Sequence, residues 1–210
     1  MTYQLYYAPG TCSMAVHVLL NEVGQKAELI AEHIHANPRN PEYLKLNPRG
    51  AVPVLVVDGK VLREGAAILT YIAETHKSPL LPASGWERAK AQEWLAFANS
   101  TLHPAYSRLF FLKGKLGEKA ATDPLYTTAT QMVQKYWDEV ESVLATQDYI
   151  AGKEITVADI LITVIANWGG YLVQPINLGA KTKAYLKRIS GRPAYQAALA
   201  AEKVEYKAAA

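Results

Sequence analysis

The sequence predicts an N-terminal α/β domain followed by an all-α domain, and three observations support this division. Residues 1–76 alternate short stretches typical of strands with helical patterns. Residues 77–85 contain two prolines and a glycine, a composition typical of a linker. In residues 86–210 the apolar positions recur only at helical spacing. We therefore place the domains at 1–76 and 86–210, joined by a linker at 77–85.

The first domain has its predicted elements in the order βαβ, then αββα. The predicted strands are residues 3–6, 28–33, 52–57 and 60–63, and the predicted helices are residues 13–22, a short helix from Pro41, and residues 65–76. Gly24 marks the end of the first helix. Asp58-Gly59 lies between the last two strands and is a strong signal for a two-residue hairpin turn. This alternation indicates an α/β domain.

The helical domain is predicted to surround one apolar helix. Residues 91–102 and 126–144 have helical patterns, and Thr156-Val157-Ala158-Asp159 is a capping-box variant with Asp in place of Glu. The residues after this motif are apolar on every side, so we expect this helix at the centre of the domain. Pro104 lacks a backbone donor and predicts a bend near Ser100.

Composition excludes several classes of protein. Of the 210 residues, 50% are apolar and 20% are charged, and the net charge is +3 without a basic cluster. A disordered chain or a nucleic-acid partner is therefore not expected. The most apolar window, residues 160–173, is interrupted by polar residues and glycines and is shorter than the roughly 20 residues that cross a bilayer. We expect no membrane partner and a cytoplasmic location, because the N-terminus also lacks a signal-peptide pattern.

Cys12 lies where the first strand leads into the first helix. It is the single cysteine, which excludes a disulfide framework and a multi-cysteine metal site, and we expect no metal. At a helix N-terminus, the free amides and the helix dipole favour a thiolate. The alternative interpretation is a partly buried small residue that only packs. Tyr7 and Ser13 flank the same turn and are rival hydroxyl donors.

Two further segments offer backbone or charged groups to a ligand. If the Val52–Pro53 bond is cis, the Val52 amide and carbonyl face outward and can pair with a peptide-like ligand. Otherwise Pro53 simply begins an edge strand. Glu64 and Gly65 end a strand and begin a helix, where the amides suit an anion and the carboxylate suits an ammonium group. An acidic residue at this position is also common for stability alone.

One stripe of the helical domain carries Ala96, Asn99, His103, Tyr106 and Phe110. His103 could titrate or donate a hydrogen bond in a cleft. The alternative interpretation is a solvated or structurally satisfied histidine.

Together these motifs resemble those of cytosolic glutathione transferases, in order and spacing, over nearly the whole chain. The resemblance rests on Tyr7-Ala8-Pro9-Gly10-Thr11-Cys12-Ser13, Asn47-Pro48-Arg49-Gly50-Ala51-Val52-Pro53-Val54-Leu55, Arg63-Glu64-Gly65-Ala66-Ala67-Ile68 and Thr156-Val157-Ala158-Asp159. Cys12 together with Leu102-His103 is similar to the bacterial beta class. The resemblance implies a thioredoxin-like domain that holds glutathione, a helical domain that forms much of the second-substrate pocket, and a homodimer.

The resemblance also implies roles for residues of the first domain. Cys12 would lie beside the glutathione sulfur, in a position to form a mixed disulfide with it. Val52, before the family's cis-proline at Pro53, would pair with the cysteinyl backbone of glutathione. Glu64 and the Gly65 amide would hold the γ-glutamyl end.

In the helical domain, the resemblance implies that His103 reaches the glutathione site. Trp168 falls where the family has an aromatic residue near the electrophile pocket, and Tyr7, Tyr106 and Phe110 are further candidates for that pocket. Thr156 and Asp159 match a cap that stabilises the fold.

Three departures from the family pattern concern glutathione binding. Gly65 stands where the family often has Ser, Pro104 stands where the beta class typically has Lys, and Ala96 replaces an expected Asn. Asn99, one helical turn later, is a candidate substitute for the missing amide. Fewer polar contacts predict weaker glutathione binding or a shifted preference.

The expected function is conjugation of the glutathione thiolate to small hydrophobic electrophiles, with thiol–disulfide exchange or peroxidase chemistry as side activities. Two alternatives remain open: a glutathione-dependent thiol–disulfide reductase, and a non-catalytic binding protein on the same scaffold. The sequence leaves open whether Cys12, Ser13 or Tyr7 activates the thiol, and which electrophile is natural.

Overall fold

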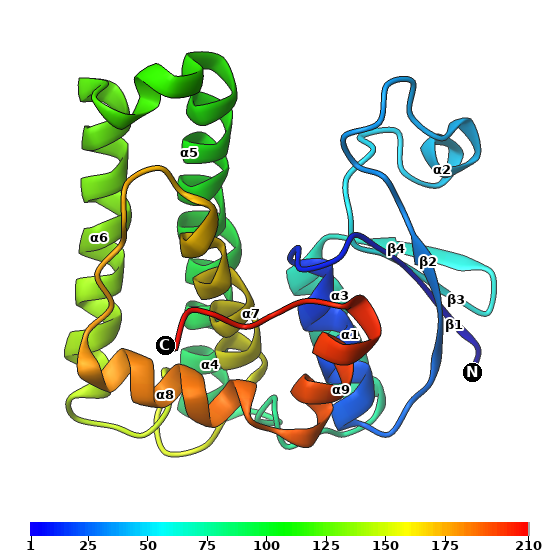
Figure 1. Ribbon diagram of the computed structural model, residues 1–210. Coiled ribbons are helices and arrows are strands. Elements are labelled where there is room, and N and C mark those ends of the chain that lie inside the picture. The colour runs from blue at the N-terminus through cyan, green and yellow to red at the C-terminus, as the bar shows by residue number, and fades with distance from the viewer. Residues whose placement is uncertain (210) are drawn as a thin grey trace.

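The computed structural model describes residues 1–209 and has an α/β domain packed beside a helical domain (Figure 1). The strands are β1 (Tyr3–Tyr7), β2 (Ala27–Ala31), β3 (Val54–Val57) and β4 (Lys60–Arg63). They form one sheet in the order β2-β1-β3-β4, in which β1 and β2 are parallel and β3 is antiparallel to both its neighbours. Asp58 and Gly59 both have positive φ, as the predicted hairpin turn requires.

Helices cover both faces of this sheet. The helices α1 (Ser13–Glu22) and α3 (Gly65–Thr75) lie on the face toward the helical domain, and α2 (Pro41–Leu46) lies on the other side (Figure 1). Successive strand residues point to opposite faces. Leu55 therefore joins the core shared with α1 and α3, whereas Val54 and Val56 pack against Tyr43 of α2.

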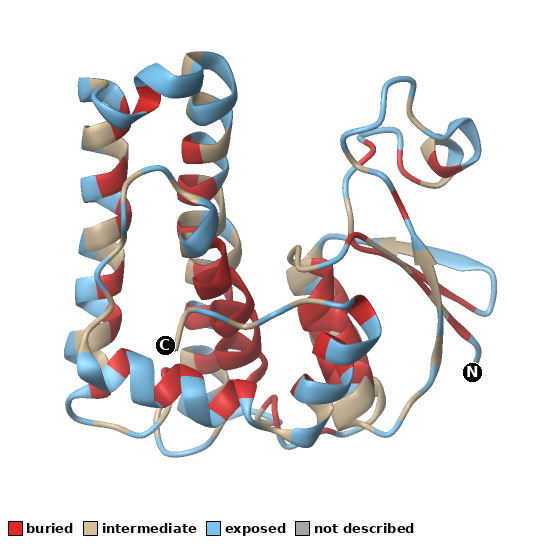
Figure 2. Cartoon of the chain, viewed as in Figure 1, coloured by how far each residue is buried: buried red, intermediate tan, exposed pale blue. Residues whose placement is uncertain are grey.

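Within residues 86–209 the second domain is built from helices, as predicted, apart from one isolated β-bridge between Tyr149 and Gly152. Its α-helices are α4 (Gly85–Ala96), α5 (His103–Leu116), α6 (Pro124–Leu144), α7 (Val157–Ala166), α8 (Ala180–Ser190) and α9 (Pro193–Glu202). All ten residues of α7 are buried, so this helix is the centre of the domain (Figure 2). One hydrophobic core runs through both domains, with α1 packed against α7 and α9. The structure thus confirms the predicted fold class.

The capping box at the start of α7 has its expected geometry. The Thr156 amide donates to Asp159 Oδ2 at 2.6 Å. Asp159 is fully buried, and it also accepts from the Ile150 amide at 2.8 Å and from the Tyr185 hydroxyl at 2.9 Å. This one carboxylate therefore joins the start of α7 to the preceding loop and to α8.

The structure corrects one local prediction and adds detail to another. The second strand, predicted at residues 28–33, ends at Ala31, because the chain turns at residues 33–36, where the Ala36 amide donates to the His33 carbonyl. Where the sequence predicts a bend near Ser100, the structure has a π-helical segment, Phe97–Leu102, which continues from α4 into α5. The His103 amide donates to the Ala98 carbonyl, five residues earlier. The next residue, Pro104, has no amide hydrogen to donate.

Residues 1–209 contain no helix that is long and apolar enough to cross a membrane. Within the same residues, no three or more His, Cys, Asp or Glu side chains gather in a way that suits a metal ion.

Candidate active site

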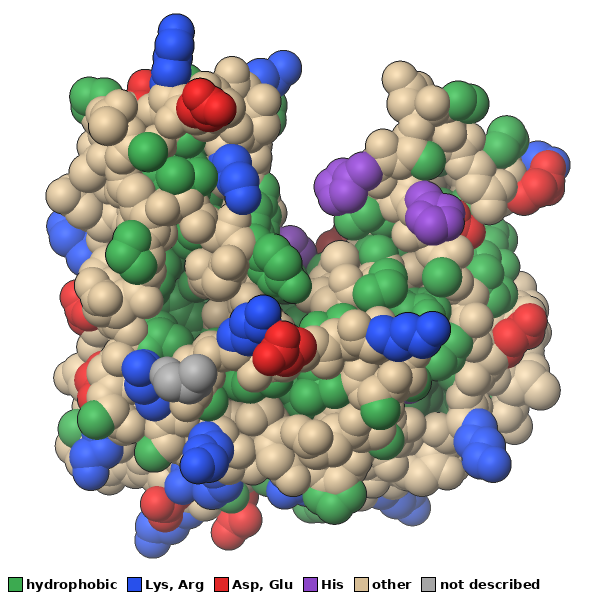
Figure 3. Space-filling model, in the orientation of Figure 1, with side chains coloured by type: hydrophobic (Ala, Val, Ile, Leu, Met, Phe, Trp, Pro, Cys, Tyr) green, Lys and Arg blue, Asp and Glu red, His purple; other side chains and the backbone are tan. Residues whose placement is uncertain are grey.

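A cleft of about 400 Å³ lies between the two domains, in the deep hollow between α5 and the α2 side of the molecule (Figure 3). It brings together seven of the predicted site residues from four separate parts of the chain. These are Cys12, Val52, Pro53, Glu64, Gly65, Asn99 and His103. The cleft also contains residues that the sequence analysis did not single out as site residues: Asn47, Arg49, Ser107 and Arg108.

Cys12 is the N-cap residue of α1, and its thiol donates to the Val52 carbonyl at 3.4 Å. Burial raises the pKa of Cys12 to about 12, and the Glu64 carboxylate adds to this shift. Of the two interpretations of Cys12, burial therefore favours a neutral thiol over a thiolate. The nearby amides do lower the pKa, but the loss of hydration outweighs them. Cys12 faces the cleft as a neutral hydrogen-bond donor.

The two rival hydroxyl donors lie outside this cleft. Ser13 is fully buried, and its hydroxyl accepts from the Ala8 amide at 3.2 Å and shares a hydrogen bond of 2.8 Å with Thr11. Tyr7 is partly buried and packs against the hydrophobic core. Of the three candidate donors, only Cys12 lines the cleft.

The loop before β3 presents the Val52 backbone to the cleft. The Val52–Pro53 bond is cis. The preceding residue, Ala51, is fixed through its carbonyl, which accepts from the buried Asn47 amide at 2.7 Å and from the Tyr43 hydroxyl at 2.5 Å. Asn47 thus supports the backbone that leads into Val52. In the sequence it could be recognised only as part of the motif at residues 47–55.

Glu64 and Gly65 place a carboxylate beside the N-terminus of α3. Glu64 has a φ of 72°, and the first backbone bond of the helix runs from the Ile68 amide to the Glu64 carbonyl. The amides of residues 65–67 therefore donate no hydrogen bond within the helix and are available to an anion. The Glu64 side chain is exposed and pairs with Arg49 at 2.7 Å. Such an exposed pair contributes little stability, so a ligand can replace it at small cost.

The backbone conformation at position 65 does not require a glycine. A Cβ at this position would meet Asn99 Oδ1 at 3.7 Å and the Pro53 ring at 3.9 Å, which are ordinary contact distances. The Asn99 amide therefore lies directly over the start of α3, although it comes from the π-helical segment of the other domain.

His103 enters the cleft at the start of α5. Burial lowers its pKa, so the imidazole is neutral at pH 7. Its ring packs edge-to-face on Trp168, with 4.8 Å between centroids. The histidine therefore has a fixed orientation and a neutral ring that can donate or accept one hydrogen bond.

The aromatic candidates lie behind His103 rather than in the cleft itself. Tyr106 and Phe110 both pack against Trp168, with centroids 5.9 Å and 6.3 Å away. Trp168 is buried, and its indole donates to the Gly10 carbonyl at 2.8 Å. The cluster thus supports both His103 and the turn that carries Cys12.

Glu202, at the end of α9, also fixes this turn. Its buried carboxylate accepts from the Gly10 amide at 3.0 Å and pairs with His17 of α1, also at 3.0 Å. No local pattern could have identified Glu202, because its partners are more than 180 residues away in the sequence.

The comparisons with known proteins agree with this geometry. Residues 1–74 match the glutathione S-transferase N-terminal domain, and residues 97–193 match the glutathione S-transferase C-terminal domain. The chain belongs to the glutathione S-transferase family. A glutathione S-transferase of Xanthomonas campestris, GST-4.5, is 34% identical over 95% of this chain and 98% of its own length.

Solved structures give the same assignment. A bacterial beta class glutathione S-transferase of Sphingomonas chungbukensis superimposes with a TM-score of 0.82 at 30% identity, covering 96% of this chain and 100% of that one. A sphingomonad glutathione S-transferase complexed with glutathione has a TM-score of 0.81 at 32% identity, with the same coverage. The resemblance to the bacterial beta class is therefore confirmed.

Proposed function

We propose that this glutathione transferase family member binds glutathione in the interdomain cleft and conjugates its thiolate to small hydrophobic electrophiles. The observation that carries the proposal is the convergence, in one cleft, of Cys12, the Val52 backbone, the start of α3 and His103. The cleft offers an acceptor for an ammonium group, amides for a carboxylate, and a strand-like backbone for a peptide. Glutathione carries all three matching groups.

In the proposed complex, the γ-glutamyl end lies at the start of α3. Its ammonium group pairs with Glu64, which gives up Arg49, and its α-carboxylate accepts from the Gly65 amide. The cysteinyl residue pairs with the Val52 backbone, which lies 3.4 Å from the Cys12 sulfur. The glutathione thiol therefore lies beside Cys12 and within reach of His103.

In the proposed reaction, neutral donors stabilise the glutathione thiolate. The glutathione thiol gives its proton to water. Cys12, whose S–H turns from the Val52 carbonyl to the ligand, and His103 then each offer one hydrogen to the thiolate. Lowering the thiol pKa from about 9 to about 6.5 is worth roughly 3 kcal/mol. The thiolate sulfur then attacks the electrophilic carbon: an S–C bond forms and, with an aryl halide, the C–halogen bond breaks and halide leaves. We assign the electrophile to the side of the cleft formed by His103 and Ser107. Trp168, Tyr106 and Phe110 lie behind His103 and support this side, and Tyr7 packs in the hydrophobic core.

The test is the rate of conjugation of glutathione to 1-chloro-2,4-dinitrobenzene by the wild type and by Cys12→Ala. Loss of one donor should lower kcat/KM by about tenfold, while the ability to form a mixed disulfide with glutathione disappears. Complete loss of conjugation, in a variant that still folds and binds glutathione, would show that Cys12 is essential. Disulfide-exchange turnover without conjugation in the wild type would favour the thiol–disulfide reductase instead.

Gly65→Ser should bind glutathione about tenfold more tightly than the wild type. The added Cβ meets only ordinary contacts, and the hydroxyl gains one hydrogen bond to a carboxylate, worth about 1.5 kcal/mol. Calorimetry measures the change in affinity, and Gly65→Ala is the matched control, with an affinity within about twofold of the wild type. Equal effects of Ser and Ala would show that the hydroxyl does not reach the ligand.

We also propose a homodimer and a cytoplasmic location, both from the family resemblance. Exposed apolar side chains that suit an interface are present on two helices, with Trp86 of α4 74% exposed and Phe111 of α5 63% exposed.

A further inference from the structure

The two walls of the interdomain cleft, which face each other across the hollow in Figure 3, differ in chemistry. The wall of the α/β domain carries the groups assigned above to glutathione. The opposite wall is the first part of α5, and it presents His103, Pro104, Ser107 and Arg108 to the cleft. Residues three and four apart lie on one face of a helix, so these side chains form a continuous surface. The second substrate must lie against this surface when glutathione occupies the other wall.

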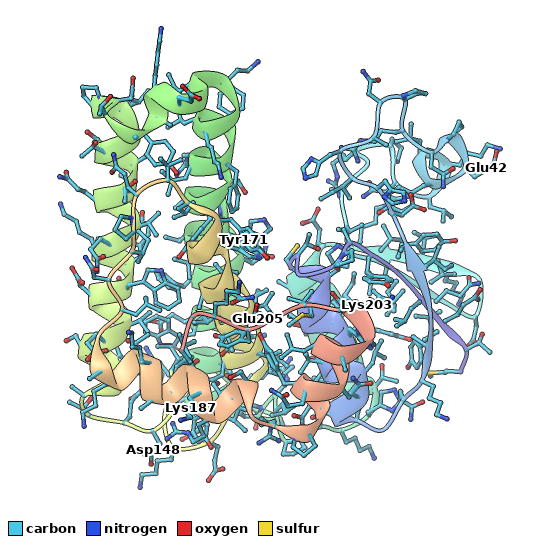
Figure 4. All side chains as sticks on the ribbon, in the orientation of Figure 1. Glu42, Asp148, Tyr171, Lys187, Lys203 and Glu205 are labelled. Carbon is cyan, nitrogen blue, oxygen red and sulfur yellow. The ribbon has the colours of Figure 1, made fainter. Side chains whose placement is uncertain are left out.

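Arg108 differs from the other two cations of α5, Lys113 and Lys115. The Lys113 ammonium donates to the Tyr171 carbonyl at 2.7 Å, where the segment after α7 meets α5 (Figure 4). The Lys115 ammonium lies 5.7 Å from the centre of the Phe111 ring. Arg108 is exposed and forms no ion pair within residues 1–209. Its permanently charged guanidinium is therefore free to bind a ligand that enters the cleft.

The other charges that line the cleft belong to the glutathione side. Glu64 is the acidic residue of the cleft lining in the described part of the chain, and it pairs with Arg49 at 2.7 Å. In the proposed complex, Glu64 takes the ammonium group of glutathione, and the amides at the start of α3 take its α-carboxylate. Arg49 remains on that same wall, beside bound glutathione. Arg108 is then the cation on the wall that faces the second substrate.

A small apolar surface adjoins Arg108. Pro104 comes four residues earlier on α5, so its ring lies one turn away on the same face of the helix. The aromatic cluster around Trp168 lies behind His103 rather than in the cleft. The α5 wall therefore offers a limited apolar surface next to a cation, and not a broad aromatic pocket. A molecule with an apolar ring and an acidic group matches both parts of this wall.

We propose that the second substrate is an electrophile that carries a carboxylate, and that Arg108 binds this carboxylate. The inference rests on the proposed function, because it concerns the space that bound glutathione leaves open. A guanidinium binds a carboxylate through two parallel hydrogen bonds, which fix the direction of the ligand as well as its position. The glutathione thiolate repels an anion, and Arg108 offsets this repulsion on the wall where the anion binds. Arg108 thus determines which electrophiles approach the sulfur.

The carboxylate itself takes no part in bond making. In a chlorinated aromatic carboxylate, the glutathione thiolate attacks the ring carbon that bears the chlorine. The S–C bond forms from an electron pair of the sulfur, and the C–Cl bond breaks. Chloride leaves with the electron pair of that bond, and the thiol proton has already passed to water.

The test is the conjugation of two matched electrophiles, 4-chloro-3,5-dinitrobenzoate and the neutral 4-chloro-3,5-dinitrobenzamide. Both react at the same ring carbon, and each kcat/KM is divided by the rate constant of the uncatalysed reaction with glutathione. For the wild type, we expect the divided value to be about tenfold higher for the benzoate, because of one charge-assisted contact. Arg108→Gln should lower the benzoate value about tenfold and leave the benzamide value within about twofold, whereas Arg108→Lys should keep most of the preference.

Lys115→Gln is the matched control, because it removes a positive charge from the same helix outside the cleft. It should leave both divided values within about twofold of the wild type. Equal losses in Lys115→Gln and Arg108→Gln would show a long-range effect of charge and would overturn the proposal.

Two other results would also overturn it. One is equal divided values for the two electrophiles in the wild type. The other is a variant Arg108→Gln that loses activity equally toward both electrophiles and has a higher KM for glutathione, since Arg108 would then bind glutathione instead.

Failure of the proposed function has a different signature. The wild type would then conjugate neither electrophile and would give no binding heat with glutathione, and this inference would fail with it. A wild type that binds glutathione and conjugates the benzamide, without preference for the benzoate, contradicts this inference alone.

Discussion

At pH 7.5, iodoacetamide should alkylate Cys12 about a thousandfold more slowly than it alkylates free cysteine. Only the thiolate reacts, and a pKa of about 12 leaves a far smaller thiolate fraction than the ordinary value near 8.5. The readout is unambiguous, because the chain has a single cysteine. Intact-mass measurements over time give the rate directly. The rate should continue to rise with pH well above 9, where free cysteine has already reached its plateau.

The unfolded protein is the control for this experiment. In concentrated denaturant, Cys12 loses its burial and should react at the rate of an ordinary cysteine. Rapid alkylation of the folded protein at pH 7.5 would show that the amides at the start of α1 outweigh burial. Cys12 would then be a thiolate, and its role would shift from hydrogen-bond donor toward nucleophile.

Asp159→Ala should destabilise the protein by about 3–5 kcal/mol, which lowers the melting temperature by about 10 °C in a chain of this length. The fully buried Asp159 carboxylate accepts four hydrogen bonds, from the amides of Ile150 and Thr156 and the hydroxyls of Thr156 and Tyr185. Its removal leaves these donors without a partner in the interior and also removes the cap of α7. Thermal unfolding followed by circular dichroism measures the effect.

Asp148→Ala is the matched control for this variant. Asp148 is exposed, and only its backbone carbonyl is used, by Arg188 (Figure 4). We expect a change within about 0.5 kcal/mol of the wild type. A similar melting temperature for the two variants would mean that the start of α7 does not depend on its capping carboxylate.

The fold could be predicted well from the sequence because its main signals are local. Asp58-Gly59 determines a hairpin from two residues, and Thr156 with Asp159 determines the start of α7 from four. The end of β2 could not be predicted, because no glycine or proline lies between Ala31 and Pro38 to mark the turn at residues 33–36. The π-helical segment was predicted only as a bend, since Pro104 shows that a hydrogen bond is missing but not which bond replaces it.

For the candidate site, the residues could be predicted from the sequence but their protonation states could not. The resemblance to glutathione transferases identified Cys12, Val52, Glu64 and His103, and all four line one cleft. Their protonation could not be predicted, because the high pKa of Cys12 follows mainly from burial, which no local pattern reveals. The contacts of Glu202 also depend on how α9 packs against α1, and no local pattern encodes that contact.

The central claim is that glutathione binds where α3 begins, beside Cys12 and Val52. Calorimetric titration of the reduced protein with glutathione tests it most directly. We expect saturable binding of one glutathione per chain, with a dissociation constant of about 1 mM or lower, weakened at least tenfold by Glu64→Gln. No binding of glutathione up to about 10 mM, or equal binding by wild type and Glu64→Gln, would contradict this account.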